Sequence, residues 1–122
     1  MTAPNLAGVS SIRGRVAGVA SLGTTATTLV TCPTDRVIKL NSIIVANIDG
    51  TDSADATINI MDITDSSEYS LAYQIPVQGQ STLVVLGKDN SLYLEEGDEL
   101  RATASAASKL SVVVSYDEIT DV

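Results

Sequence analysis

Apolar and polar residues alternate along most of the chain from residue 24 onward, as expected for strands that bury one face. Residues 56–63 place Ile58 and Ile60 on one side and Thr57 and Asn59 on the other. Comparable runs, most of them bounded by Gly, Pro, Asn or Asp, occupy residues 24–31, 36–48, 56–63, 69–75, 82–86, 92–94, 100–106 and 110–116. About eight short strands at roughly ten-residue spacing predict an all-β fold, a single β-sandwich of the jelly-roll or immunoglobulin-like kind.

The same alternation predicts which side chains fill the core. In the strand over residues 69–75, the larger residues Tyr69, Leu71, Tyr73 and Ile75 share one face. The residues expected to be buried are Ile44, Ile58, Ile60, Leu71, Val84, Leu100, Val112 and Val114. A core of small aliphatic side chains is thin, so oligomerisation or docking on a larger assembly would add useful burial.

The first 20 residues differ from the remainder. They are rich in Gly and Ala, with only scattered larger apolar residues. Residues 1–34 carry Arg13 and Arg15 and no acid, whereas residues 35–122 carry all 15 acids and five bases. We therefore divide the chain into an extended N-terminal arm or edge segment over residues 1–20 and a sandwich domain over residues 21–122.

Composition argues against most enzyme classes. The chain of 122 residues has no His and one Cys, which removes the commonest general base and any Cys-based zinc cluster. We therefore expect a protein that is not an enzyme and that needs no cofactor. The net charge of −8 is unfavourable for nucleic-acid binding. Uninterrupted apolar runs, such as residues 43–46, are far shorter than the ~20 residues of a membrane helix, so we expect no membrane partner.

Two acidic stretches and the cysteine are the candidates for chemistry. The first stretch offers oxygen ligands for calcium, although its spacing does not match an EF-hand: Asp49, Asp52, Asp55, Asp62, Asp65 and Glu68. The second offers the carboxylate pair of a glycosidase, but Gly97 makes a tight hairpin turn the better interpretation: Glu95, Glu96, Asp98 and Glu99. Cys32 lacks an activating base and is expected to be a half-buried apolar residue.

Three segments carry structural motifs: LNSIIVANIDG (40–50), SLYLEEGDELRATASA (91–106) and VVVSYDEI (112–119). These segments resemble those of small virion structural proteins of marine and cyanobacterial tailed phages. The shared features are an apolar strand ending in Ala-Asn, a Leu-acidic-Gly-Asp turn before a Thr/Ala/Ser strand, and a C-terminal Ser-Tyr-acidic ending. The likeness covers about residues 37–119, and its motifs are structural.

This resemblance implies a capsid decoration (cement) protein on the outer surface of the virion capsid. The implied partners are the major capsid protein and, in a homotrimer, other copies of the chain. A tail, collar or fibre-head protein is the alternative within virions. A calcium- or carbohydrate-binding β-sandwich is the alternative outside them.

The N-terminal arm is the predicted contact with the partner, because it is the one stretch that an acidic surface does not repel. Its expected contact residues are Leu6, Val9, Ile12, Arg13, Arg15 and Val16. We expect the arm to be disordered until it binds. The alternative is that residues 9–20 form an ordinary edge strand and that strand-connecting loops make the contact.

Overall fold

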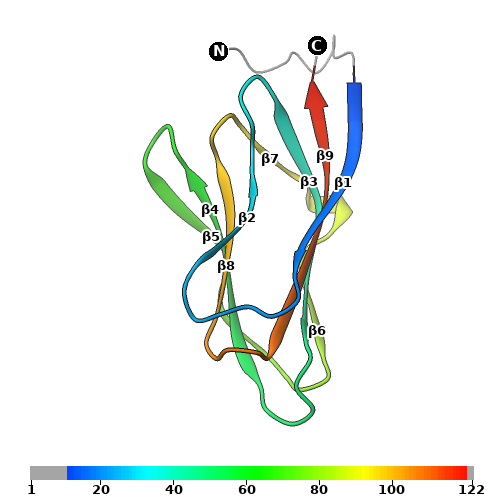
Figure 1. Cartoon of the computed structure of the whole chain (residues 1–122), viewed down its shortest axis with the longest axis vertical. Helices are drawn as coiled ribbons and strands as arrows, with labels where there is room; N and C mark the ends of the chain where they lie inside the picture. Colours follow the sequence, from blue (N-terminus) through cyan, green and yellow to red (C-terminus); the bar gives the residue numbers. More distant parts are fainter. Residues whose placement is uncertain (1–10, 121–122) are drawn as a thin grey trace.

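A computed structural model describes residues 11–120, which form nine strands and one short 3-10 helix (Figure 1). The strands are β1 (Ser11–Val19), β2 (Thr27–Thr31), β3 (Val37–Asn47), β4 (Ala54–Asp62), β5 (Ser67–Val77), β6 (Thr82–Leu86), β7 (Leu92–Leu94), β8 (Glu99–Ala104) and β9 (Leu110–Thr120). The 3-10 helix η2 (Lys88–Asn90) precedes β7. In this part of the chain no helix has the length and apolar character needed to cross a membrane.

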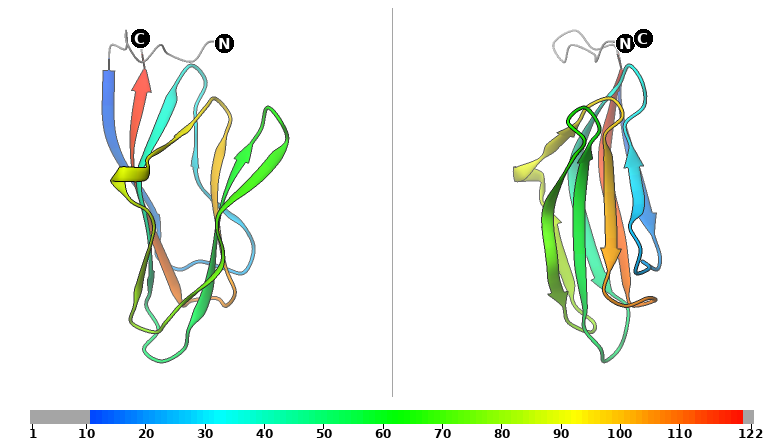
Figure 2. Two further views of the ribbon diagram at one scale, coloured as in Figure 1. Left: turned by 180° about the vertical axis from the view of Figure 1, so that it is seen from behind. Right: turned by 90° about the vertical axis from the view of Figure 1, so that its left-hand side faces the viewer.

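The strands form two antiparallel sheets that pack face to face (Figure 2). Sheet A has the order β1-β9-β3-β6, with β7 also paired to β3, and sheet B has the order β2-β8-β4-β5. The chain passes repeatedly from one sheet to the other. The two resulting strand orders are those of a jelly roll and not those of an immunoglobulin domain. The predicted β-sandwich is thus confirmed, with one strand more than expected.

Aliphatic side chains from the inner faces of both sheets make one core. Leu40, Ile43 and Leu94 come from sheet A, whereas Ile58 and Leu100 come from sheet B, and all five are fully buried. Four of the eight predicted core residues are buried: Ile58, Leu100, Val112 and Val114. Ile60 and Leu71 are partly buried and pack against this core.

The prediction was wrong for Ile44 and Val84. The run over residues 43–45 is apolar throughout, so alternation does not say which side chains point inward. The structure buries Ile43 and Val45 completely, which turns Ile44 to the outer face. Val84 lies opposite Ile44 in the β3–β6 ladder and therefore shares that outer face.

The expected face of strand β5 is buried only in part, at Leu71, which packs against the core. Ala72 and Val77 are buried, while Tyr69, Tyr73 and Ile75 are exposed. The register between β4 and β5 shifts twice near Ile58, and Gln74 has a φ of 51°. Each β-bulge inserts one residue and so reverses the side on which the following side chains lie.

Residues 11–19 do not form a free arm. They are strand β1, an edge strand paired with β9 over its whole length, from Ser11 opposite Thr120 to Val19 opposite Val112. Ala17 and Val19 pack against the core, which fixes the strand's orientation. The expectation of disorder until binding is therefore wrong for these residues. Residues 1–10, with Leu6 and Val9, lie outside the described residues.

A buried position on sheet B and an exposed position on sheet A provide a direct test of this packing. Leu100→Ala should lower the free energy of unfolding by about 2–5 kcal/mol, because it leaves a cavity among fully buried neighbours. Val84→Ala, at an exposed position, should change it by less than about 0.5 kcal/mol. Urea unfolding followed by circular dichroism measures both. Equal losses in the two variants would contradict the assignment of faces.

Candidate functional site

Strand β1 separates the predicted partner-binding residues onto two sides of sheet A. Arg15 pairs with Tyr116, whose side chain packs against the core, so Arg13 and Arg15 point to the inner side of the sheet. Ile12 and Val16 point to the outer side and are exposed. The expected single contact strip is thus two different surfaces, one basic and one apolar.

The outer side of sheet A carries aliphatic residues that we call the apolar face. Ile12, Val16, Val84 and Val113 are exposed, and Ile44 is half-buried. Val113, Ile44 and Val84 lie directly opposite one another on the paired strands β9, β3 and β6. The exposed fractions are 71% for Val16, 60% for Val84 and 43% for Val113. Contiguous exposed apolar side chains are typical of interaction surfaces.

Gly18 completes this row on β1, opposite Val113. A Cβ at this position would lie 3.0 Å from the carbonyl oxygen of Val112 and 3.4 Å from Cγ2 of Val113. Glycine therefore permits the close approach of β1 and β9 and leaves Val113 uncovered from that side. Sequence reasoning missed the row because its members come from four separate strands.

The outer side of sheet B is polar. It presents Thr28, Thr57, Asn59, Glu99, Arg101 and Thr103. Arg101 makes an ion pair with Glu99 at 2.9 Å and a longer one with Glu68 at 3.9 Å. Thr28 donates a hydrogen bond to Glu99 at 3.0 Å. The two outer faces of the sandwich therefore differ in chemistry, and between residues 11 and 120 the aliphatic row lies on sheet A.

At one end of sheet A, arginines gather on the inner side. A pocket of about 160 Å³ is lined by Ser11, Arg13, Arg15, Arg36, Glu118 and Thr120, and we call it the arginine pocket. The Nε of Arg15 lies 3.3 Å from Oε1 of Glu118, and Nη1 of Arg36 lies 3.5 Å from the same oxygen. Sequence reasoning found Arg13 and Arg15 from their spacing but not Arg36 and Glu118, which the β-sheet register brings to them.

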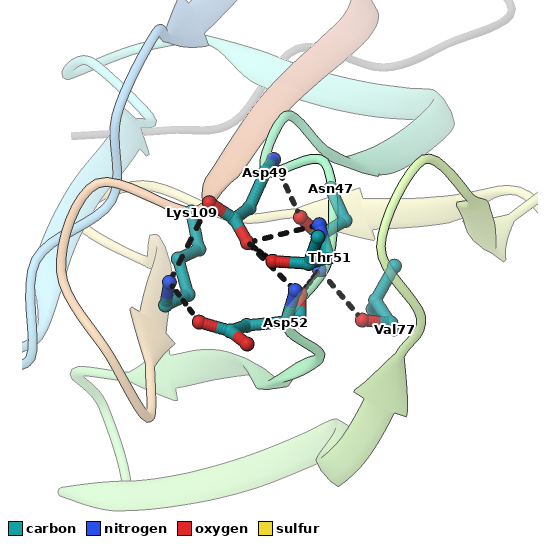
Figure 3. A network of polar contacts seen from close by, with 6 residues as sticks. All are labelled: Asn47, Asp49, Thr51, Asp52, Val77 and Lys109. Atoms are coloured by element: carbon teal, nitrogen blue, oxygen red, sulfur yellow. Dashed lines mark hydrogen bonds and ion pairs between the residues drawn. The ribbon is translucent and has the colours of Figure 1, made fainter.

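At the opposite end, a polar network fixes the loop between β3 and β4 (Figure 3). The buried Asn47 donates from Nδ2 to the carbonyl oxygens of Asp52 and Val77, at 2.9 and 2.8 Å. The Asp49 carboxylate accepts hydrogen bonds from the backbone N–H groups of Thr51 and Asp52. Lys109 lies 3.6 Å from Asp49 and 3.1 Å from Asp52. These contacts lower the pKa of Asp49 below its ordinary value, and the hydrogen bond from the Asp52 N–H has the largest effect.

The six acids proposed as calcium ligands are not brought together. Asp49 and Asp52 belong to the Lys109 network, and Asp62 accepts hydrogen bonds from the backbone N–H groups of Thr64 and Asp65. Over residues 11–120 no group of three or more His, Cys, Asp or Glu side chains has an arrangement that could hold a metal ion. The calcium alternative gains no support from these residues.

The second acidic stretch forms a turn, as expected, but the turn connects the two sheets and does not close a hairpin. β7 belongs to sheet A and β8 to sheet B. Gly97 has a φ of +83°, a conformation that glycine adopts without strain. Asp98 is buried and accepts hydrogen bonds from the N–H groups of Ile63 and Glu95. This carboxylate therefore holds the connection in place.

Cys32 is more deeply buried than the sequence suggested. Its side chain is 2% exposed, and the thiol donates a hydrogen bond to the carbonyl oxygen of Arg36 at 3.2 Å. Desolvation raises the pKa of this thiol to about 11. A buried thiol with a raised pKa is a poor nucleophile and a poor partner for a disulfide.

No protein-family model matches the sequence, and neither does any protein with a curated description. A solved structure with a similar fold is a protein of Bacillus endospore appendages, which are described as a novel family of disulfide-linked pili. The TM-score is 0.53 at 14% sequence identity, and the alignment covers 90% of this chain and 88% of that one. At this identity the likeness shows the shared fold alone.

The state of Cys32 can be tested by alkylation. Iodoacetamide should modify Cys32 slowly in the native protein at pH 8 and rapidly after unfolding, because the native thiol is protonated and covered. Because the pKa of the thiol is raised in the native state, the protonated thiol stabilises the fold at pH values below 9.0, the ordinary pKa. This contribution is lost as the pH rises through the native pKa of about 11. Mass spectrometry measures the modification. Equal rates in native and unfolded protein would contradict the burial.

The Asp49 network predicts a pH dependence. Because the pKa of Asp49 is lowered in the native state, the charged carboxylate stabilises the fold at pH values above 3.8, its ordinary pKa. This contribution disappears as the pH falls through the native pKa. Asp49→Asn should therefore melt below the unmodified chain at neutral pH, and the difference should shrink in acid. Asp89→Asn, which removes a charge from the exposed η2, is the matched control. A difference that grows in acid would contradict the network.

Proposed function

We propose that this protein is a structural subunit of a virion, a capsid decoration protein that binds the outer surface of the assembled major capsid protein shell. The resemblance of residues 37–119 to virion structural proteins motivates the class of assembly. The observation that carries the proposal is the apolar face. Its aliphatic side chains lie in register on three neighbouring strands, with Val84 and Val113 exposed and Ile44 half-buried between them, and such a surface favours contact with another protein.

The mechanism is thermodynamic. A protein that binds the assembled shell more tightly than its free subunits stabilises the shell by mass action. Many copies act together, so each contact can be weak. The apolar face suits this role because burying Val16, Val84 and Val113 would contribute roughly 25 cal/mol for each Å² of apolar surface removed from water. The face contributes nothing of this kind in the free subunit.

A homotrimer is the assembly state that we propose. The reason is the resemblance: decoration sites commonly lie at local threefold axes of icosahedral shells. A tail, collar or fibre-head location would use the same surface with a different partner. Analytical ultracentrifugation at micromolar concentration distinguishes a free trimer from a monomer.

A second candidate is a subunit of a self-assembling filament. It is favoured by the similarity in fold to the Bacillus endospore appendage protein. Disulfide linkage of the kind named for those pili would need an accessible thiol, whereas Cys32 is buried and no other Cys is present in the sequence. A filament of this chain would therefore depend on non-covalent contacts.

The proposal predicts that Val84→Asp weakens binding to assembled major capsid protein shells. A carboxylate at this site would have to be desolvated in the interface, and that loss should weaken binding by at least about tenfold. Co-sedimentation with purified shells measures the bound fraction, and circular dichroism verifies folding. Tyr73→Asp is the matched control, because it places the same charge at an exposed position on sheet B.

Three outcomes separate the candidates. Binding lost in Val84→Asp and kept in Tyr73→Asp supports decoration through the apolar face. Binding kept in both variants places the contact elsewhere. Absence of binding by the unmodified chain, together with filaments visible by electron microscopy, favours the self-assembling alternative.

A further inference from the structure

The arginine pocket has more positive charge than its internal contacts use. Among the described residues, three guanidinium groups and one carboxylate, that of Glu118, line the pocket, and only Arg15 and Arg36 form ion pairs with it. Both ion pairs reach a single oxygen, Oε1, and each uses one nitrogen of its arginine. A guanidinium has five N–H donors in a planar fork, so most of the donors in this pocket remain available to a ligand.

Arg13 is the least engaged of the three. Within residues 11–120 it makes no ion pair, although the register places it directly opposite Glu118. The side chains of Arg15 and Arg36 are 41% and 37% exposed, while that of Glu118 is 13% exposed. Glu118 is thus a partly buried anchor that holds two arginines, and the open side of the pocket is basic.

The open side coincides with an unpaired sheet edge. Among the described strands, β1 pairs only with β9, so its other edge has no partner strand in this part of the chain. Unpaired backbone N–H and C=O groups on an edge strand are a template for an added strand. The arginines on β1 therefore lie between the acid of β9 on one side and a vacant strand position on the other.

We propose that the β1 edge binds an extended segment of a partner protein chain that places an acidic side chain in the arginine pocket. A residue opposite Arg13 or Arg15 on an added strand projects from the same side of the sheet as these arginines, with Cβ atoms about 5 Å apart. A carboxylate there repeats, on the free side, the contact that Glu118 makes from β9. Backbone pairing supplies the affinity, and the arginines select an acidic sequence.

This inference concerns a different surface from the apolar face and does not rest on the proposed function. It is tested with a fluorescein-labelled peptide of about eight residues in which Glu alternates with Val, since the segment must be extended and acidic on one side. A second peptide has Gln in place of each Glu. Fluorescence anisotropy with the full chain measures binding, and no shell is present in the assay.

The expected result is that the Glu peptide binds at least about tenfold more tightly than the Gln peptide, and that added salt removes the difference. Arg13→Gln should reduce binding of the Glu peptide by about tenfold without changing the melting temperature, because Arg13 makes no ion pair with any residue from 11 to 120. Lys39→Gln is the matched control. It removes the same charge from the outer side of sheet A, where Lys39 lies opposite Asp117.

Several results would overturn the proposal. Equal affinity for the two peptides, or equal effects of Arg13→Gln and Lys39→Gln, would show non-specific attraction. Arg13-dependent binding of inorganic phosphate without binding of the Glu peptide would assign the pocket to a small free anion. Self-association of Arg13→Gln in sedimentation, with unchanged peptide affinity, would mean that the arginine only protects the edge from pairing with other copies.

Discussion

The register of β9 is the constraint on which the described surfaces depend. This strand pairs with β1 on one side and β3 on the other, along nearly its full length. Its inward residues Val112 and Val114 enter the core, Val113 lies in the apolar face, and Glu118 anchors the arginine pocket. A shift by one residue would exchange the two faces of the strand. It would turn Val112 and Val114 outward and bring the neighbouring serines into the core.

The sequence predicted the fold class because alternation and turn residues agree along the chain. It predicted Val112 and Val114 correctly, because the polar Ser111 and Ser115 on either side of the apolar run 112–114 show which face points outward. It failed where alternation is interrupted: at Ile44, inside a continuous apolar run, and in part along β5, where two bulges near Ile58 shift the register. A bulge changes hydrogen-bond pairing without any strong signal in residue type, so one sequence does not reveal it.

The candidate sites, too, could be predicted from the sequence only in part. Spacing alone showed that Arg13 and Arg15 share a side, because residues two apart in a strand do so. Arg36 and Glu118 are distant in sequence from them and reach the pocket only through strand pairing. The acids between Asp49 and Glu68 looked like a cluster along the chain, but turns and the Lys109 network hold them apart.

The pairing of Ser11 with Thr120 brings the two ends of the described fold to neighbouring positions on adjacent strands. A circular permutant could therefore join residue 120 to residue 11 through a short linker and open the chain elsewhere, for example in the loop between β5 and β6. Such a rearranged chain would keep both sheets but move its free ends to the opposite pole. Fluorophores or affinity tags could then be attached far from the arginines.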